Sequence, residues 1–181
     1  MIVTSAELLT DAFERVQQTV HAAVGGLSAA QLENFRRELA ARLDDDANSI
    51  AWLCWHLARV QDDHVADAFG VEQAWPRFID RFGLPFEPDA TGYGHSSAQV
   101  ALVRISSGDL LTSYHDAVHD QTVALVSGLT DADLWRVVDE RWDPPVTLGV
   151  RLVSVISDGL QHAGQAAFIR GVLLRAEGQG G

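Results

Sequence analysis

The sequence has 181 residues, of which 47% are hydrophobic and 21% charged, and its formal net charge is -12 at pH 7. This charge argues against proteins that bind nucleic acid or anionic membranes, because both partners require a basic surface. All 13 basic residues are arginines and Cys54 is the single cysteine, which excludes lysine Schiff-base chemistry, an intramolecular disulfide and a multi-cysteine zinc site.

The first predicted helix begins at Thr4 or Ser5. Thr4 and Glu7 have the spacing of a capping box, and the glycine pair at 25–26 is typical of a helix end. A shorter, charged helix is predicted from Ser28. The apolar residues that share one face of the first helix are Leu9, Phe13, Val16, Val20, Ala23 and Leu27.

The second long helix is predicted from about Ser49 to Ala68, after a break that contains three consecutive aspartates. Its apolar face is formed by Ile50, Leu53, Leu57 and Val60, with His64 at its end. His56 lies beside this face, and Asp63 returns to the side of His56 at about 100° per residue. Cys54 lies between two tryptophans and is expected to be a buried, inert thiol.

Residues 70–105 are rich in proline and glycine and predict a long ordered connection, with a helical turn near Ser97. Ser106 or Ser107 then begins a third helix that runs to about Ser127. This helix carries His115 and His119, whose spacing can chelate a metal, but a solvated helix face is the expected interpretation. No β-strand and no internal repeat are predicted.

The last helix is predicted from Leu148 to Arg175, and residues 177–181 are expected to fray. Its apolar positions recur at alternating steps of four and three: Leu148, Leu152, Val155, Gly159, His162, Ala166, Ile169 and Leu173. Small residues replace large ones at the middle of this face, where His162 and Asp158 lie one turn apart. This pattern indicates space for a polar group, although such a pair alone is more often a surface pair or a buried, hydrogen-bonded histidine.

Together these elements predict an all-α protein, a four-helix bundle over residues 1–181 with a long crossover connection between the second and third helices. Bundles of this kind build metal sites from side chains on facing helices. No apolar run approaches the ~20 residues of a membrane span, and no secretory signal is visible. We therefore expect a cytoplasmic protein, and the arginine-rich, lysine-free composition suggests a high-GC bacterial source.

Two stretches, NSIAWLCWHLARVQDDHVADAFG and SVISDGLQHAGQAAFIRG, resemble the DinB superfamily. Within it, they are similar to the branch with mycothiol-dependent maleylpyruvate isomerase and other thiol transferases. The resemblance implies a bundle, commonly dimeric, that holds a divalent metal on three side chains. His56 matches the ligand in the second helix, and Asp158 and His162 match the pair in the last helix. Many members have histidine at the position of Asp158, and the isomerase branch has glutamate.

The resemblance also implies a chemistry. Two imidazoles and a carboxylate suit Zn, Ni or Fe, and open positions on the metal would bind a small-molecule thiol such as mycothiol as a thiolate that attacks an electrophile. Arg59 and Arg170 are candidates to hold substrate carboxylates, with internal ion pairs as the alternative. Gln165 and Asp63 could orient the ligating histidines.

Two other functions stay open at this point. The bundle could be a non-enzymatic, stress-associated protein with a vestigial metal pocket, which the shorter side chain at Asp158 would fit. It could also bind a small molecule without metal. Apolar positions on the long helices would suit a homodimer.

Overall fold

The computed structural model describes residues 3–25, 40, 42–105 and 107–178. The long helices of this part of the chain are α1 (Ser5–Val24), α3 (Ile50–Phe69), α6 (Gly108–Val126) and α7 (Leu148–Gly178). The short elements are η1 (Trp75–Arg77), α4 (Ile79–Phe82), α5 (Ser97–Val100), η2 (Asp133–Trp135), β1 (Val137–Asp139) and β2 (Val146–Thr147). The helix predicted from Ser28 lies outside the described residues, as does Leu27.

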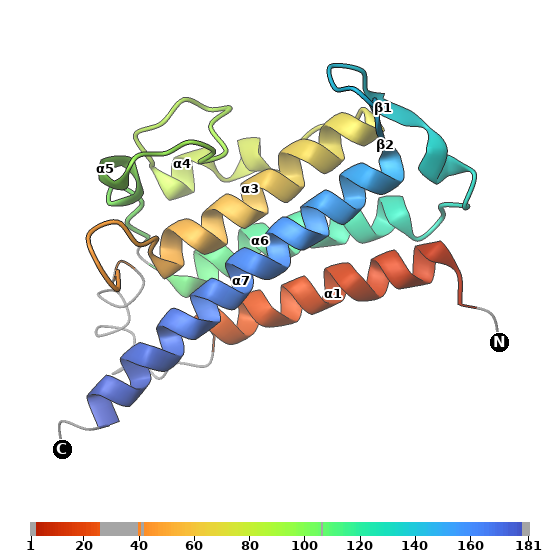
Figure 1. Ribbon diagram of the computed structural model, residues 1–181. Coiled ribbons are helices and arrows are strands. Elements are labelled where there is room, and N and C mark those ends of the chain that lie inside the picture. Colours follow the sequence, from red (N-terminus) through yellow and green to blue (C-terminus); the bar gives the residue numbers. More distant parts are fainter. Residues whose placement is uncertain (1–2, 26–39, 41, 106, 179–181) are drawn as a thin grey trace.

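The four long helices form a bundle, as Figure 1 shows. Helix α7 packs against α3 and α1, and α6 contacts the same two helices from the far side. The predicted apolar face of α7 is buried in this arrangement, with Leu148, Leu152 and Ala166 fully inside. The mostly helical DinB-like fold expected from the sequence is therefore confirmed.

The helix boundaries follow from capping residues in the sequence. The Thr4 hydroxyl accepts the backbone N–H of Glu7, and the Glu7 carboxylate accepts the backbone N–H of Thr4 at 2.8 Å, which completes the predicted capping box. The hydroxyls of Ser49 and Ser107 cap α3 and α6 by accepting the backbone N–H groups of Trp52 and Asp109, without the reciprocal bond of a capping box. Gly70, with φ of 66°, ends α3 in the left-handed conformation that favours glycine.

The long connection between α3 and α6 is held against α3 by a buried polar pair. The Asp62 carboxylate accepts the backbone N–H groups of Ala74 and Trp75, each at 2.8 Å. The Arg59 guanidinium lies 3.6 Å from Asp62 and donates to the carbonyl oxygen of Ala90 at 3.1 Å. This network ties the connection, which contains η1, α4 and α5, to α3 near its start and in its middle.

The expectation that the chain has no strand was wrong. Strands β1 and β2 pair in antiparallel register, with Val137 opposite Thr147 and Asp139 opposite Val146. Runs of three and two residues are too short for the alternation of apolar and polar residues that identifies a strand in a sequence. The loop of this hairpin carries Trp142 next to the N-terminal end of α7.

The expected solvated face on α6 was also wrong. His115 is completely buried and His119 nearly so. Helix α6 contacts both α1 and α3, and its buried surface is therefore wider than its apolar stripe. Burial lowers the pKa of His115 to about 3.

Cys54 is buried, and burial raises the pKa of its thiol to about 12, which makes it the inert thiol expected from the sequence. Among the helices of the described residues, none combines the length and apolar character that crossing a membrane requires.

Candidate metal centre

Three side chains from α3 and α7 meet inside the bundle. His56 lies on α3, and Asp158 and His162 lie one turn apart on α7. Each offers one ligand atom, and these atoms all lie within 4.8 Å of one another. The closest pair is His162 Nε2 and Asp158 Oδ1 at 3.4 Å. The helix pair thus brings together residues that are about a hundred positions apart in the sequence.

The ring of His56 is fixed in orientation by two contacts. Its Nδ1 donates to the carbonyl oxygen of Thr91 at 2.6 Å, which leaves Nε2 as the acceptor nitrogen. Trp52 stacks on one face of the imidazole ring, with the two ring centroids 4.5 Å apart and the ring planes inclined by 16°. Burial lowers the pKa of His56, and this favours the neutral imidazole that a metal requires.

The ring of His162 is also held in one orientation, in this case by two neighbours on α7. Its Nδ1 lies 3.1 Å from Gln165 Oε1, so this nitrogen is the donor and Nε2 faces Asp158. The hydrogen bond with Asp158 raises the pKa of His162. The second carboxylate oxygen of Asp158, Oδ2, is buried and has no hydrogen-bond partner among the described residues.

These residues fit a divalent metal of the borderline class. Metal–ligand bonds of about 2.1 Å allow two ligands of one ion to lie at most about 4 Å apart, and the three atoms approach that separation. Both histidines direct Nδ1 to an oxygen, which is the usual arrangement of a ligating imidazole. A cation would also satisfy the buried Asp158 Oδ2, whose isolation is otherwise unfavourable. Three protein ligands leave open positions, as in catalytic rather than structural zinc sites.

The residues predicted to orient the ligands or to bind substrate differ in their surroundings. Gln165 contacts His162, as expected for a residue that orients a ligand. Asp63 instead accepts from Gln73 Nε2 at 2.9 Å and lies beside His64. Arg59 is fully buried and lies 3.6 Å from Asp62 in the network that holds the long connection, and its predicted role in substrate binding stays a prediction.

Arg170 donates to the backbone carbonyl of Ala22 and so links α7 to α1. Its predicted role in substrate binding stays a prediction.

The small residues of α7 have more than one role. Gly159 faces α1, and a Cβ at this position would lie 3.1 Å from Val16 Cγ1, so this glycine allows the two helices to approach. Ala163 and Ala166 are buried in the core. Gly164 faces open space. Gly159, Ala163 and Ala166 are therefore explained by the packing of α7 in the bundle rather than by space for a polar group.

Sequence reasoning missed the carbonyl of Thr91, because a backbone acceptor has no residue signature. The following residue gives an indirect signal. Gly92 has φ of 93°, and a Cβ there would lie 2.9 Å from His56 Nδ1 and from the ring of Trp55. The predicted connection between α3 and α6 therefore contributes to the centre through a close backbone approach that only glycine permits.

A cavity of about 500 Å³, hereafter the triad cavity, opens beside the centre between α3 and α7. His56 and Asp158 form part of its wall. The side chains that line the remainder include Asp63, His64, Tyr93, Trp142, Arg151 and Ser154.

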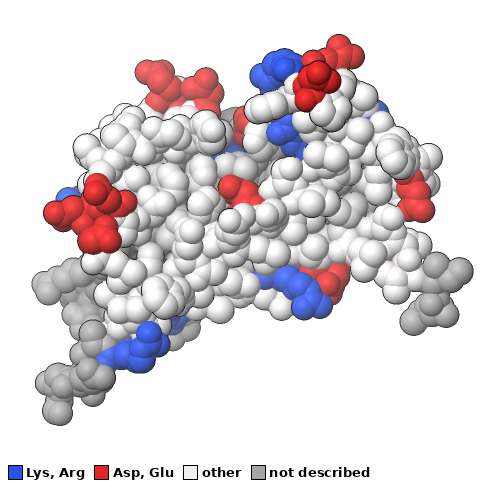
Figure 2. Space-filling view, viewed as in Figure 1, with Lys and Arg blue, Asp and Glu red and all other residues white. Residues whose placement is uncertain are grey.

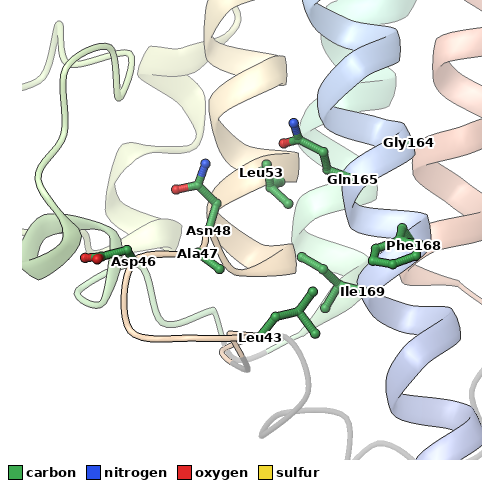
Figure 3. A pocket seen from close by; sticks show the side chains of 9 residues that line it. All are labelled: Leu43, Asp46, Ala47, Asn48, Leu53, Gly164, Gln165, Phe168 and Ile169. Atoms are coloured by element: carbon green, nitrogen blue, oxygen red, sulfur yellow. The ribbon is translucent and has the colours of Figure 1, made fainter.

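A second cavity, also of about 500 Å³, lies between the segment at 43–48, α3 and α7. Figure 3 shows polar Asn48 and Gln165 at one end and apolar Leu43, Phe168 and Ile169 at the other. Gln165 lines this cavity and also contacts His162, so this side chain separates the second cavity from the candidate metal centre.

Comparisons with known proteins show what the chain is similar to. The family model described as mycothiol S-transferase matches residues 8–174, a range that contains all three candidate ligands. Among solved structures, a conserved protein from Enterococcus faecalis is similar, with a TM-score of 0.81 and 25% sequence identity over 93% of this chain and 96% of that chain. No curated protein matches.

Proposed function

The chain belongs to the mycothiol S-transferase family, within the DinB-like superfamily, and from this premise we propose that it is a metal-dependent enzyme that joins mycothiol, through its sulfur, to an electrophile. The observation that carries the proposal is the convergence of His56, Asp158 and His162, with ligand atoms within 4.8 Å of one another and a buried carboxylate oxygen that lacks a partner among the described residues.

A divalent metal held by these side chains would supply one effect, which is to lower the pKa of a thiol that reaches it, so that the thiol is a thiolate at neutral pH. The protein's own residues determine how the three candidate ligands are oriented. The carbonyl of Thr91 and the amide of Gln165 fix the two imidazole rings, and Asp158 contributes negative charge. The triad cavity leaves room for the thiol and its reaction partner beside the centre.

The proposed reaction forms a carbon–sulfur bond. With an electrophile that carries a halide, sulfur attacks the carbon, the halide leaves with the bonding electron pair, and the thiol proton passes to solvent. With a conjugated double bond, sulfur and a proton add across the bond. Neither route needs an oxidant or a reductant.

The direct test is conjugation of mycothiol to monochlorobimane, whose chloride is the leaving group. We expect activity in the wild type and a loss of about 100-fold or more in His56→Ala and His162→Ala, because each removes a ligand. His21→Ala is the matched control, since His21 is exposed and pairs with Asp116 on α6, outside the centre. Equal rates in all four proteins would contradict the proposal.

A further inference from the structure

His64 lines the triad cavity but does not belong to the three candidate ligands. It lies on α3, as His56 does, and both histidines form part of the cavity wall together with Asp158. The side chain of His64 is 39% exposed, so a molecule in the cavity can reach its ring. A histidine that faces a reaction cavity without binding the metal is available to act on a substrate.

The hydrogen bond between Arg151 and His64 determines which ring nitrogen carries the proton. Arg151 Nη1 lies 3.4 Å from His64 Nδ1, and a guanidinium can only donate, so Nδ1 is the acceptor. The competing partner, Asp63 Oδ2, lies 3.7 Å from the same nitrogen, which is beyond hydrogen-bond distance. The proton of a neutral His64 ring is therefore on Nε2, and the described part of the chain supplies no partner for this donor.

Arg151 is itself held by a buried carboxylate. Its Nη2 donates to Asp139 Oδ2 at 2.9 Å, and Asp139 Oδ1 also accepts from Arg141 Nε at 2.9 Å. Two guanidinium groups thus compensate the burial of the Asp139 charge. The series of contacts from Asp139 through Arg151 to His64 joins β1, α7 and α3, so the β1–β2 hairpin helps to orient the His64 ring.

The surroundings of His64 also keep its ring neutral. Burial and then the positive charge of Arg151 lower the pKa of His64, against smaller opposite effects of Asp63, Asp158 and Asp67. A neutral imidazole with its proton on Nε2 cannot accept a second proton at that nitrogen. It can instead donate a hydrogen bond to an oxygen that gains negative charge during a reaction.

From this geometry we propose that His64 is a catalytic residue whose Nε2–H binds the carbonyl oxygen of a conjugated carbonyl electrophile, with Asp139 and Arg151 as positioning residues. The thiolate sulfur forms a bond to the far carbon of the C=C bond, and the π electrons move to the carbonyl oxygen. His64 stabilises the enolate that results. The thiol proton has passed to solvent, and a proton from solvent adds to the carbon beside the carbonyl group.

The inference rests on the proposed function and names the class of its electrophile. A conjugated carbonyl compound develops negative charge on oxygen, where a hydrogen-bond donor is effective. An alkyl halide develops that charge on the leaving halide and has no oxygen for His64 to bind. The protein should therefore favour conjugated carbonyl compounds.

The tautomer of His64 can be measured by nitrogen NMR of the full chain loaded with Zn²⁺, with the signals assigned by their loss in His64→Gln. We expect the proton on Nε2 in the wild type. Arg151→Met should move it to Nδ1, because Asp63 is then the nearest acceptor. A wild-type ring with the proton on Nδ1 would overturn the inference.

The catalytic role is tested with two electrophiles for mycothiol, benzylideneacetone, which is a conjugated ketone, and benzyl chloride, which has no carbonyl group. His64→Leu should lower kcat/KM for benzylideneacetone at least about tenfold more than for benzyl chloride. His64→Gln retains an N–H donor and should recover most of this difference. His21→Leu is the matched control, since His21 pairs with Asp116 outside the cavity, and it should change neither rate.

The Zn²⁺ content of each variant should equal that of the wild type, because His64 is not among the candidate ligands. Loss of Zn²⁺ in His64→Leu would overturn the inference, since His64 would then act through the metal centre. Equal fractional losses with the two electrophiles, or no loss, would also overturn it and leave the proposed function standing. Absence of conjugation with both electrophiles in the wild type would overturn the proposed function itself, and with it the role of His64.

Discussion

Gly92 controls how closely the connection between α3 and α6 approaches the metal centre. Gly92 and Gly94 both have positive φ, and alanine at either position is expected to cost about 1–2 kcal/mol in backbone strain. At Gly92 alone, the added Cβ would lie 2.9 Å from His56 Nδ1. We therefore expect Gly92→Ala to displace His56 from the carbonyl of Thr91 and to weaken metal binding about tenfold or more, measured by competition with a chelator.

Gly94→Ala is the control for this prediction, because no atom lies within 4 Å of its Cβ position. It should lower the free energy of unfolding by a similar strain and leave metal affinity unchanged. Equal metal affinities in the two variants would show that the contact between Thr91 and His56 does not orient the ligand.

His115 makes stability depend on pH. Burial lowers its pKa from 6.5 to about 3, so between these values the unfolded chain binds more protons than the folded one. Its contribution to stability is complete above pH 6.5 and is lost as the pH falls, at up to about 1.4 kcal/mol per pH unit. His115→Leu removes the titrating group, and we expect the variant to lose less stability than the wild type between pH 7 and pH 5.

Urea unfolding at the two pH values measures this difference directly. Histidines that do not interact with His115 titrate alike in both proteins and cancel in the comparison. Identical losses in the wild type and in His115→Leu would mean that His115 is not held neutral by the fold.

At the residue scale, the three candidate ligands were predicted from the resemblance to the DinB superfamily, and helical periodicity alone singled out only the pair Asp158 and His162. The burial of His115 and His119 could not be predicted in the same way. It depends on α6 packing between two neighbours, which the apolar stripe of α6 alone does not reveal.

At the scale of elements, the contact between α1 and α7 depends on a glycine. A Cβ at Gly159 would lie 3.1 Å from Val16 Cγ1, whereas one at Gly164 would meet no atom within 4 Å. Gly159→Leu should destabilise the protein by about 1–3 kcal/mol through overpacking. Gly164→Ala should stabilise it by about 0.5–1 kcal/mol, because alanine favours the helix.

Thermal or urea unfolding of the two variants checks both signs. A Gly159→Leu variant as stable as the wild type would show that the helices separate without cost at this point. A destabilised Gly164→Ala would contradict the open surroundings of Gly164.

Helices and strands with a clear local sequence pattern were predictable. Those that depend on contacts with other parts of the fold were less predictable. Local sequence predicted three helix starts to within a residue or so, at Thr4 or Ser5, about Ser49, and Ser106 or Ser107, and the structure has the caps at Thr4, Ser49 and Ser107. The last helix continues to Gly178, beyond the predicted Arg175. The β1–β2 hairpin depends on its position next to α7, which contacts both strands, and not on a readable pattern.

At the scale of the whole molecule, the outer face of α7 is a surface with few charges. Figure 2 shows mostly uncharged atoms over the diagonal that α7 occupies in Figure 1. The large apolar side chains exposed on this helix include Val150, Val153, Leu160 and Phe168. The homodimer predicted from the sequence is therefore expected to use this face.

Light scattering of the purified protein gives the oligomeric state. We expect a dimer in the wild type and a shift toward the monomer in the double variant Val153→Glu with Leu160→Glu, because two carboxylates would be buried in the interface. Trp135→Glu, at an exposed position in η2, should leave the dimer intact. A monomeric wild type would contradict the prediction.

The central claim is that His56, Asp158 and His162 form a metal site, and elemental analysis of the protein tests it most directly. The protein is purified without a metal-affinity column, and Zn, Ni and Fe are measured per chain. We predict about one divalent ion per chain in the wild type, lost in His56→Ala and His162→Ala and retained in His21→Ala. A chain that holds no metal, even after incubation with excess divalent ions, would contradict the site and favour a bundle with a vestigial pocket.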